Sequence, residues 1–297
     1  MTERCGFVAV VGAPNAGKST LVNALVGQKV AIVSPKAQTT RTRLIGVAIA
    51  GESQMLLVDT PGIFAPRRRL DRAMVAAAWG GAQDADLIAF VIDAKTGITH
   101  RIADLLDTLA QRREPKLVIL NKVDICTKES LLDLAVRLQD KLAPEAIYMV
   151  SAATGDGIED LRAALAARVP EGPWHFPEEQ VSDATDRMLA AEVTREQLFL
   201  QLHAELPYDS AVETEKYEER KDGSVAIHQQ ILIARDSQKA IILGKRGTRL
   251  KEIGSRSREE LEKLLDRKVH LFLHVKVAEK WGEDRGLYRE IGLDWVD

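Results

Sequence analysis

The 297-residue sequence predicts an α/β protein of two domains, a larger one built on a mostly parallel β-sheet and a smaller α+β one. Residues 1–170 alternate short apolar runs with helical patterns, which is typical of a parallel sheet covered on both faces. Residues 168–183 contain three prolines and one glycine, so we place an irregular linker at 171–183. Residues 184–297 then follow the order helix, strand, strand, helix, helix, strand.

The strands of the first domain are expected where apolar and β-branched residues form short runs. These runs are Phe7–Val11, Leu44–Ala50, Met55–Val58, Leu87–Ile92, Leu117–Leu120 and Ile147–Val150. Helical spacing of apolar residues between them predicts helices that include Lys18–Val26, Leu70–Gly80 and Thr99–Gln111.

The second domain should begin with a long helix over 184–206, capped by Asp183 or Thr185. Two strands joined by a turn at 222–223 follow, over 212–218 and 224–234. A short helix then enters a glycine turn, a second helix runs over 248–266, and a last strand covers 269–277.

Composition excludes several classes of protein. The 29% charged and 45% hydrophobic residues are an ordinary soluble balance, and a net charge of −3 means that a nucleic-acid partner would be met by a local patch. Two cysteines are too few for a disulfide framework or a four-ligand zinc site, so we expect a reducing, cytoplasmic compartment. No signal peptide and no apolar run long enough to span a membrane is found, and we expect a monomer.

A phosphate-binding loop is predicted at "GAPNAGKST", which fits G-x-x-x-x-G-K-[ST] between a strand and a helix. Its backbone N–H groups form an anion nest at a helix N-terminus, Lys18 neutralises phosphate oxygens, and the Ser19 hydroxyl is placed to hold Mg²⁺. A glycine-rich turn without nucleotide is the alternative. The candidate nucleotide-binding residues here are Gly12, Ala13, Pro14, Asn15, Ala16, Gly17, Lys18, Ser19 and Thr20.

A second element is "DTPG", which begins at Asp59 and ends at Gly62. A carboxylate at a strand's carboxyl end beside the phosphate loop can orient Mg²⁺ through water, and the Gly62 N–H can contact a γ-phosphate. A plain strand-ending turn is the alternative.

The base is chosen by "NKVD", whose candidate residues are Asn121, Lys122 and Asp124. The Asp124 carboxylate can accept both hydrogens of guanine N1–H and N2–H₂, whereas adenine presents an acceptor there. The loop "SAATG" adds Ser151, Ala152 and Ala153 as candidates for a backbone N–H to the guanine carbonyl. An ATPase or nucleotide kinase is the alternative enzyme.

For GTP hydrolysis, the sequence lacks the glutamine with which Ras-like enzymes orient the attacking water, because Ile63 follows Gly62. Asn15 is a candidate ligand for a K⁺ ion against the phosphates; the alternative is that it stabilises its own turn. In the polar loop "SPKAQTTRTR" either Thr39 or Thr40 can meet Mg²⁺, and we prefer Thr40; a solvated polar loop is the alternative. The catalytic candidates are therefore Lys18, Thr40, Asp59 and Gly62.

A second phosphate-binding turn is expected at "GKRG" near the carboxyl end. Its setting, between an apolar segment and an amphipathic helix, fits a loop that clamps the backbone of single-stranded RNA; protein interaction or a solvated turn are the alternatives. Ile231 and Ile233, or neighbours on the adjacent strand, would form the floor under the bases. Trp281, Tyr288 and Trp295 can stack on bases or pack against helices. The RNA-binding candidates are Lys239, Gly244, Lys245, Arg246, Gly247, Arg249 and Lys251.

These segments, with "ELPY" and "ILGKRGTRLKEIG" in the second half, resemble the Era family of bacterial GTPases over nearly the whole chain. The resemblance implies a Ras-like P-loop GTPase domain over 1–170 and a type II KH domain with a C-terminal tail over 184–297. It implies slow GTP hydrolysis, binding to the 3′ region of 16S ribosomal RNA, and a role in 30S subunit assembly. It also implies Mg²⁺ as cofactor, potassium-stimulated hydrolysis and peripheral association with the inner membrane.

Two classes of function remain. In one, an enzyme's GTP cycle controls RNA engagement; in the other, an RNA-binding assembly factor uses hydrolysis only to reset itself. They differ in whether RNA affinity depends on the γ-phosphate.

Overall fold

The computed structural model describes residues 2–36, 39–41, 43–64, 66, 68–83, 85–290 and 292–296. The chain divides into two compact units. The first comprises Met1–Ala31 and Thr40–Asp183, and the second comprises Ile32–Thr39 and Ala184–Asp297. A short segment from the amino-terminal half therefore belongs to the carboxyl-terminal unit, which the sequence did not indicate.

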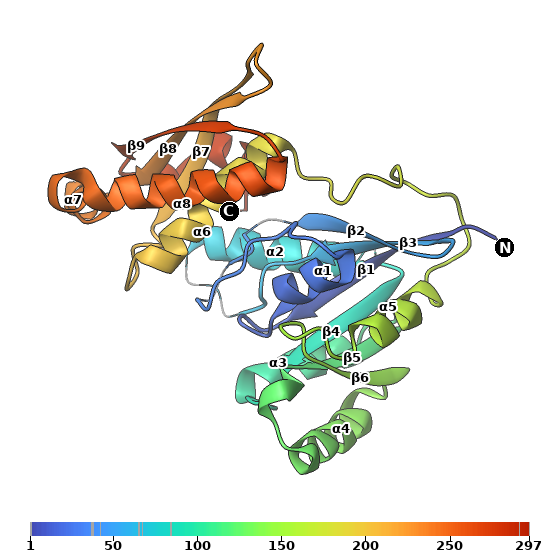
Figure 1. Cartoon of the computed structure of the whole chain (residues 1–297). Coiled ribbons are helices and arrows are strands. Elements are labelled where there is room, and N and C mark those ends of the chain that lie inside the picture. The colour runs from blue at the N-terminus through green and yellow to red at the C-terminus, as the bar shows by residue number, and fades with distance from the viewer. Residues whose placement is uncertain are drawn as a thin grey trace. The chain divides into compact units, whose positions relative to one another are not determined.

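The first unit is built on a sheet with the strand order β2-β3-β1-β4-β5-β6 (Figure 1). The β2–β3 pair is antiparallel and the other neighbours are parallel, so the predicted mostly parallel sheet is confirmed. Its strands are β1 (Arg4–Gly12), β2 (Leu44–Ala50), β3 (Ser53–Asp59), β4 (Leu87–Asp93), β5 (Lys116–Asn121) and β6 (Ala146–Val150). The carboxyl ends of the parallel strands meet at one edge, where the loops that carry the motifs begin.

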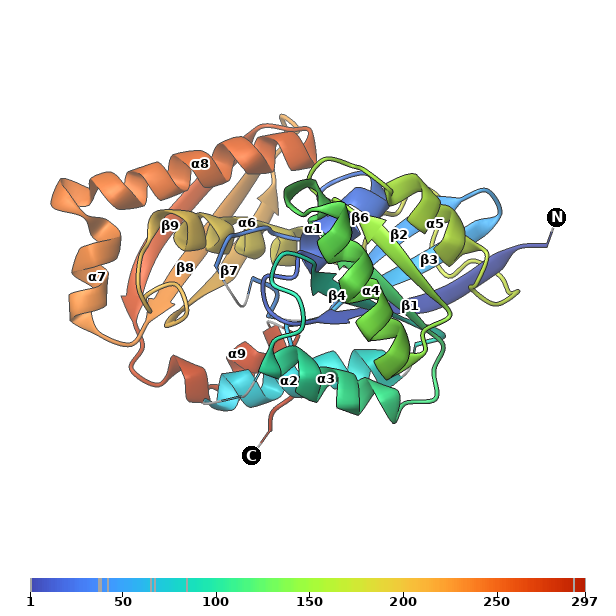
Figure 2. The ribbon, with the colours of Figure 1, turned by 90° about the horizontal axis from the view of Figure 1, so that it is seen from below.

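Helices cover both faces of this sheet (Figure 2). On one face α1 (Lys18–Val26) and α5 (Ile158–Ala166) pack against Val8 and Val10 of β1. On the other, α2 (Arg69–Gln83), α3 (His100–Ala110) and α4 (Lys128–Leu142) pack against a core that includes Ala9 and Val11. Successive residues of the buried strand thus contribute to opposite cores, which explains why Phe7–Val11 is apolar throughout.

The linker ends in a short antiparallel addition to the edge strand β2. The Val47 N–H donates to the Val181 carbonyl at 2.8 Å, and Gly46 pairs with Ser182. The Asp183 carboxylate accepts the Ile45 N–H at 2.8 Å, and burial raises the pKa of this carboxyl group. The otherwise irregular connector is therefore fixed to the sheet at its last residues.

The second unit has the predicted element order. Its elements are α6 (Asp186–Gln201), β7 (Ser210–Glu219), β8 (Val225–Ile233), α7 (Asp236–Leu243), α8 (Thr248–Leu265) and β9 (Val269–Val277). The sheet order is β7-β8-β9, with β7 antiparallel and β9 parallel to β8. Buried residues of α6, α7 and α8 pack together with residues of these strands. Short turns η1 (Val123–Ile125), η2 (Lys245–Gly247) and η3 (Trp281–Glu283) and the helix α9 (Arg285–Glu290) complete the assigned elements.

Helix α6 is shorter than the apolar pattern predicted. It starts after Thr185, whose side chain accepts the Met188 N–H at 3.3 Å, so Thr185 rather than Asp183 is the cap. It ends at Gln201 because Leu202 is extended and Ala204 adopts a left-handed conformation. Leu202 and Leu206 are buried without being helical, which is why apolar spacing overestimated the length of the helix.

Over the described parts of the chain, no helix combines the length and apolarity that a membrane span requires.

Val33, Lys36 and Thr39 are attached to α6 within the second unit. The Val33 N–H donates to Glu196 Oε1 at 2.7 Å, and the Lys36 ammonium donates to the carbonyls of Phe199 and Leu202 at the carboxyl end of the helix. Arg195 donates to the Thr39 carbonyl. A cation at the carboxyl end of a helix satisfies carbonyls that have no partner within the helix and is favoured by the helix dipole.

Candidate functional site

The loop between β1 and α1 has the conformation of an anion-binding nest. Gly17 is left-handed (φ +91°), and a Cβ there would lie 2.3 Å from Asn121 Nδ2, so only glycine fits. The first turn of α1 has no side-chain cap, which leaves its backbone N–H groups available to a ligand. The local structure therefore favours binding of phosphate oxygens.

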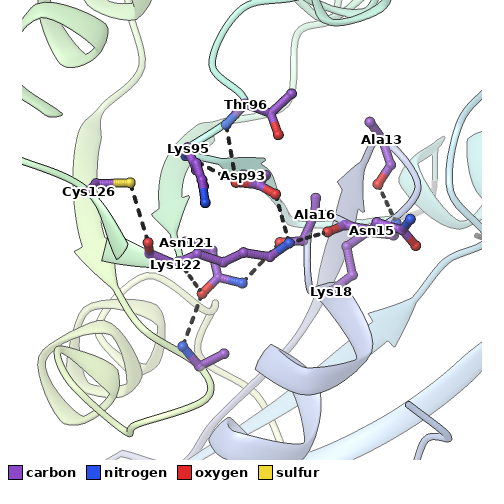
Figure 3. Close-up of polar contacts among 11 residues, drawn as sticks. Ala13, Asn15, Ala16, Lys18, Asp93, Lys95, Thr96, Asn121, Lys122 and Cys126 are labelled. Atoms are coloured by element: carbon purple, nitrogen blue, oxygen red, sulfur yellow. Dashed lines mark hydrogen bonds and ion pairs between the residues drawn. The ribbon is translucent and has the colours of Figure 1, made fainter. Parts of the chain in front are cut away.

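Lys18 points into this loop. In this structure its ammonium donates to the carbonyls of Gly12 and Ala13 at 3.3 and 3.1 Å (the Ala13 contact is drawn in Figure 3). Burial lowers the pKa of Lys18 to about 8, and the negative charge of Asp59 only partly opposes this. A phosphate beside the ammonium would stabilise its charged form.

Three of the predicted metal-site side chains lie together. Ser19 Oγ and Thr40 Oγ1 are 2.8 Å apart, and both are within hydrogen-bond distance of Asp59 Oδ2, at 2.8 and 3.0 Å. Two hydroxyls and a carboxylate are oxygen donors of the kind Mg²⁺ prefers. Thr39 does not join them: its hydroxyl donates to the Lys36 carbonyl at 3.2 Å. These residues fit a magnesium ion, and the geometry favours Thr40 over Thr39.

The "DTPG" turn lies against the phosphate loop. The Ile63 N–H donates to the Gly12 carbonyl at 3.1 Å. A Cβ on Gly62 would lie 2.8 Å from the backbone nitrogen and Cα of Pro14, so the close approach of these two segments requires glycine. Ile63 packs against the apolar core and offers no polar atom to a water molecule.

Asn121 joins the base-reading loops to the phosphate loop (Figure 3). Its Nδ2 donates to the Ala16 carbonyl at 2.9 Å, and its Oδ1 accepts the N–H groups of Lys122 and Ala152 at 2.9 and 3.0 Å. Since the Ala152 N–H is already used, the neighbouring Ala153 is the better candidate to donate to a guanine carbonyl. Ser151 is buried and accepts the Thr154 N–H at 3.3 Å, which shapes the loop.

Asp124, the predicted base-reading carboxylate, is exposed in the turn η1. It follows Lys122, whose backbone is left-handed (φ 67°). This sharp turn separates the roles of the neighbouring side chains, since Asn121 points into the protein and Asp124 remains accessible to a ligand.

One polar residue at the same sheet edge was missed by the sequence reasoning. Asp93 ends β4 and pairs in register with Asn121 of β5. Its Oδ2 lies 2.7 Å from Lys122 Nζ, which also donates to the Asn15 carbonyl at 2.8 Å (Figure 3). A carboxylate at the end of a parallel strand was the available signal, because the preceding strand β3 ends in the same way at Asp59.

The "GKRG" turn links α7 to α8. Gly244 has φ +67°, and a Cβ there would lie 2.8 Å from Arg249 Cβ, whereas Gly247 (φ +77°) faces open space. Arg246 is itself left-handed at φ 54°. The side chains of Lys245, Arg246, Arg249 and Lys251 are exposed and that of Lys239 is half-buried, so this set of cations can meet an anionic partner.

A groove of about 430 Å³ runs from this turn along α8 and β9. Ile231 and Ile233 do not form its floor, because both are fully buried in the core of β8. Leu271 and Leu273 of the adjacent strand β9 form the floor instead, as the sequence analysis allowed when it named neighbours on the adjacent strand. The groove is lined by Gly247, Leu250, Lys251, Gly254, Ser255, Arg258, Leu271 and Leu273.

The cation Arg258 was missed by the sequence reasoning, although it could have been found. Gly247, Lys251, Ser255 and Arg258 recur every three or four residues and therefore share one face of α8. The aromatic residues of the tail pack instead of facing this groove. Trp281 and Tyr288 are buried, and the Trp295 ring lies edge-on to Tyr288, with 5.1 Å between centroids.

Two protein-family models match parts of the chain, and similar proteins match its full length. Residues 7–122 match the family described as 50S ribosome-binding GTPase, and residues 205–282 match the KH domain family. Among similar proteins, GTPase Era of Erythrobacter litoralis is 59% identical over the full length of both chains. GTPase Era of Rhizobium meliloti is 57% identical, covering 98% of this chain and 93% of its own.

Two solved structures of Era are similar over nearly the whole length of the chain. One is Era in complex with MgGDPNP and nucleotides 1506–1542 of 16S ribosomal RNA, with a TM-score of 0.92 and 38% identity, covering 98% of this chain and 99% of that one. The other is a variant of Aquifex aeolicus Era bound to GDP·AlF4⁻, with the same TM-score and identity, covering 97% and 99%. Because relatives named GTPase Era match over the full length of the chain, and family models match a GTPase domain and a KH domain within it, the chain belongs to the Era family of GTPases.

Proposed function

We propose that this protein is a GTP-hydrolysing switch that binds the 3′ region of 16S ribosomal RNA through its KH domain and assists 30S subunit assembly. The similar Era structure with MgGDPNP and nucleotides 1506–1542 of 16S ribosomal RNA supports both ligands. We further propose that it acts as a cytoplasmic monomer and that any contact with the inner membrane is peripheral.

The GTP site is proposed to comprise the phosphate loop, "DTPG", "NKVD" and "SAATG". Ser19 and Thr40 would bind Mg²⁺ directly, Asp59 would orient it through water, and Lys18 would contact the β- and γ-phosphates. The metal supplies charge neutralisation on those phosphates. Asp124 would select guanine, and the Gly62 N–H would contact the γ-phosphate.

One observation carries the proposal that GTP controls RNA binding. Thr40 lies with Ser19 and Asp59 at the proposed metal position, and the residue before it ends the segment that is fastened to α6. Binding of GTP and Mg²⁺ at Thr40 would pull on a segment anchored to the first helix of the RNA-binding unit. Of the two classes of function, this favours the enzyme whose cycle controls RNA engagement.

The test is a titration of labelled RNA from the 3′ end of 16S ribosomal RNA, at stated salt, with GDP and with a non-hydrolysable GTP analogue. We expect tighter binding with the analogue. Equal affinities would contradict control by GTP and would leave hydrolysis as a reset step.

The RNA clamp is tested by Gly247→Asp, with Gly223→Asp as the matched control. Both glycines are left-handed and face open space, but Gly223 lies in the β7–β8 turn. A carboxylate beside RNA phosphates should weaken binding by about 2 kcal/mol or more at position 247 only. Replacing Lys245 and Arg246 by alanine should flatten the salt dependence by up to about two units of slope. We expect GTP turnover to be unchanged in these variants. Normal RNA binding by Gly247→Asp would show that the "GKRG" turn is not the clamp.

Potassium stimulation is proposed to depend on Asn15. This residue is left-handed (φ 65°) and exposed, and no described residue forms a hydrogen bond with its side chain, so its carbonyl oxygen is available to a cation. Hydrolysis should be faster in potassium than in sodium at equal ionic strength, and Asn15→Ala should abolish the difference. Equal turnover of the wild type in both salts would leave Asn15 as a turn residue.

A further inference from the structure

Asp93 occupies a central place in the nucleotide site. It ends β4 next to Asn121, and its carboxylate uses both oxygens. Oδ1 accepts the backbone N–H groups of Lys95 and Thr96 at 3.0 and 3.3 Å, while Oδ2 lies 2.7 Å from Lys122 Nζ. The Asp93 carbonyl also accepts the N–H of Thr96 at 3.1 Å. These contacts leave the carboxylate little freedom to rotate.

The Lys122 ammonium connects two loops that are far apart in sequence. The Lys122 side chain extends from the base-reading loop, forms an ion pair with Asp93, and donates to the Asn15 carbonyl of the phosphate loop at 2.8 Å. Lys122 and Asn15 are both non-glycine residues in the left-handed region, at φ 67° and 65°. Such conformations persist only where surrounding contacts hold them.

We propose that Asp93 is a positioning residue for GTP binding: through Lys122 it holds the base-reading loop and the phosphate loop at the separation that the nucleotide spans. This inference rests on the assignment of the site to GTP. Asp93 itself need not contact the nucleotide. Without the Asp93 carboxylate, the Lys122 ammonium keeps only the neutral Asn15 carbonyl as a partner. The base-reading loop and the phosphate loop are then free to separate when no nucleotide is bound.

Asp93→Asn tests the proposal with little change in shape. Asparagine has one acceptor oxygen where Asp93 uses two, so its amide N–H must face either the backbone N–H groups or the Lys122 ammonium. We expect the KM for GTP to rise about tenfold, as for loss of a partly exposed charge-assisted hydrogen bond, and bound GDP to dissociate correspondingly faster. The kcat at saturating GTP should stay within about twofold, because bound nucleotide itself holds the loops together.

Asp104→Asn is the matched control. It removes the same charge from α3, where the Asp104 side chain is 69% exposed and lies 3.3 Å from His100 Nδ1. Its KM and GDP dissociation rate should equal those of the wild type. Thermal unfolding of all variants without nucleotide separates a binding defect from a loss of folded protein.

Lys122→Met supplies a second arm. If Asp93 acts through Lys122, adding Asp93→Asn to Lys122→Met should change the GDP dissociation rate no further. Additive effects, an unchanged KM in Asp93→Asn, or a fall in kcat alone would each overturn the positioning role. A wild-type protein that does not bind GTP would instead overturn the nucleotide assignment itself.

Discussion

A buried chain of hydrogen bonds holds α6 against the sheet of the second unit. The Thr194 hydroxyl donates to Gln229 Oε1 at 2.6 Å, and Gln229 Nε2 donates to Thr214 Oγ1 at 3.2 Å. The Thr214 hydroxyl in turn donates to the Arg187 carbonyl at 3.0 Å. Both Thr194 and Gln229 are fully buried. No water can replace a partner that is removed.

Thr194→Val should therefore destabilise this unit although it preserves the side-chain shape. An orphaned buried acceptor costs about 1 to 3 kcal/mol, and complete burial of Gln229 places the expected cost near 2 kcal/mol. A loss of that size should speed the exchange of slowly exchanging β8 amides about thirtyfold. Hydrogen exchange followed by mass spectrometry measures this, and peptides from β5 in the other unit provide an internal control.

Two further variants decide the cause. Ser257→Ala also deletes a buried hydroxyl, but that hydroxyl donates to the Ile253 carbonyl four residues earlier in its own helix, so its loss should have a small effect. Adding Gln229→Leu to Thr194→Val removes both partners of the Thr194–Gln229 hydrogen bond, and the Thr214 hydroxyl, which loses the Gln229 donor, still donates to the Arg187 carbonyl. The double variant should therefore recover much of the protection. The reasoning is refuted if Thr194→Val leaves β8 exchange unchanged, or if the double variant is no better protected than the single one.

Three other predictions concern the nucleotide site. Asp124→Asn should shift preference from GTP towards xanthosine triphosphate, because the amide donates where guanine also donates; competition binding checks this, and unchanged GTP affinity would disprove the base assignment. GDP binding should take up about one quarter of a proton at about pH 7.5 and about three quarters at about pH 8.5, because phosphates recharge a Lys18 whose pKa is about 8 in the empty site. The affinity for GDP should thus fall about threefold as the pH rises between these values. Because the proton comes from the buffer, the calorimetric heat of binding should depend on the buffer used, and a heat that does not would contradict the prediction. Gly62→Ala should lower stability by about 1 to 3 kcal/mol through its clash with Pro14, whereas Gly80→Ala, with nothing within 4 Å, should not; equal melting temperatures would show that the segments can separate freely.

Much of the fold could be predicted because its signals are local. Strands of the first sheet contain continuous apolar runs, and the polar motifs follow directly at strand ends, as Asp59 and Asn121 show. A parallel sheet then gathers those ends at one edge without further information.

The errors arose where contacts between distant residues decide the outcome. Leu202 and Leu206 fit the helical apolar pattern, yet they are buried beyond the end of α6. Ile231 is as apolar as Leu271, and only the strand order places one in the core and the other in the groove. Asp93 acts through Lys122, 29 residues later, and no periodicity encodes such a pair.

The contacts of Val33, Lys36 and Thr39 with α6 have a consequence for synthesis of the chain. Val33 and Glu196 are 163 residues apart, so at about 5 to 20 residues per second about 10 to 30 s pass between their incorporation. The five strands β2 to β6 of the first sheet are translated in this interval, and the nascent chain has its phosphate loop long before α6 exists. Val33 and Lys36 then have no helix to bind, and the loop that leads to Thr40 is untethered. A newly made GTPase unit should therefore bind its nucleotide while the loop that leads to Thr40 is not yet attached to α6. A fragment that begins at residue 184 would lack Val33, Lys36 and Thr39, which contact its first helix in the whole protein.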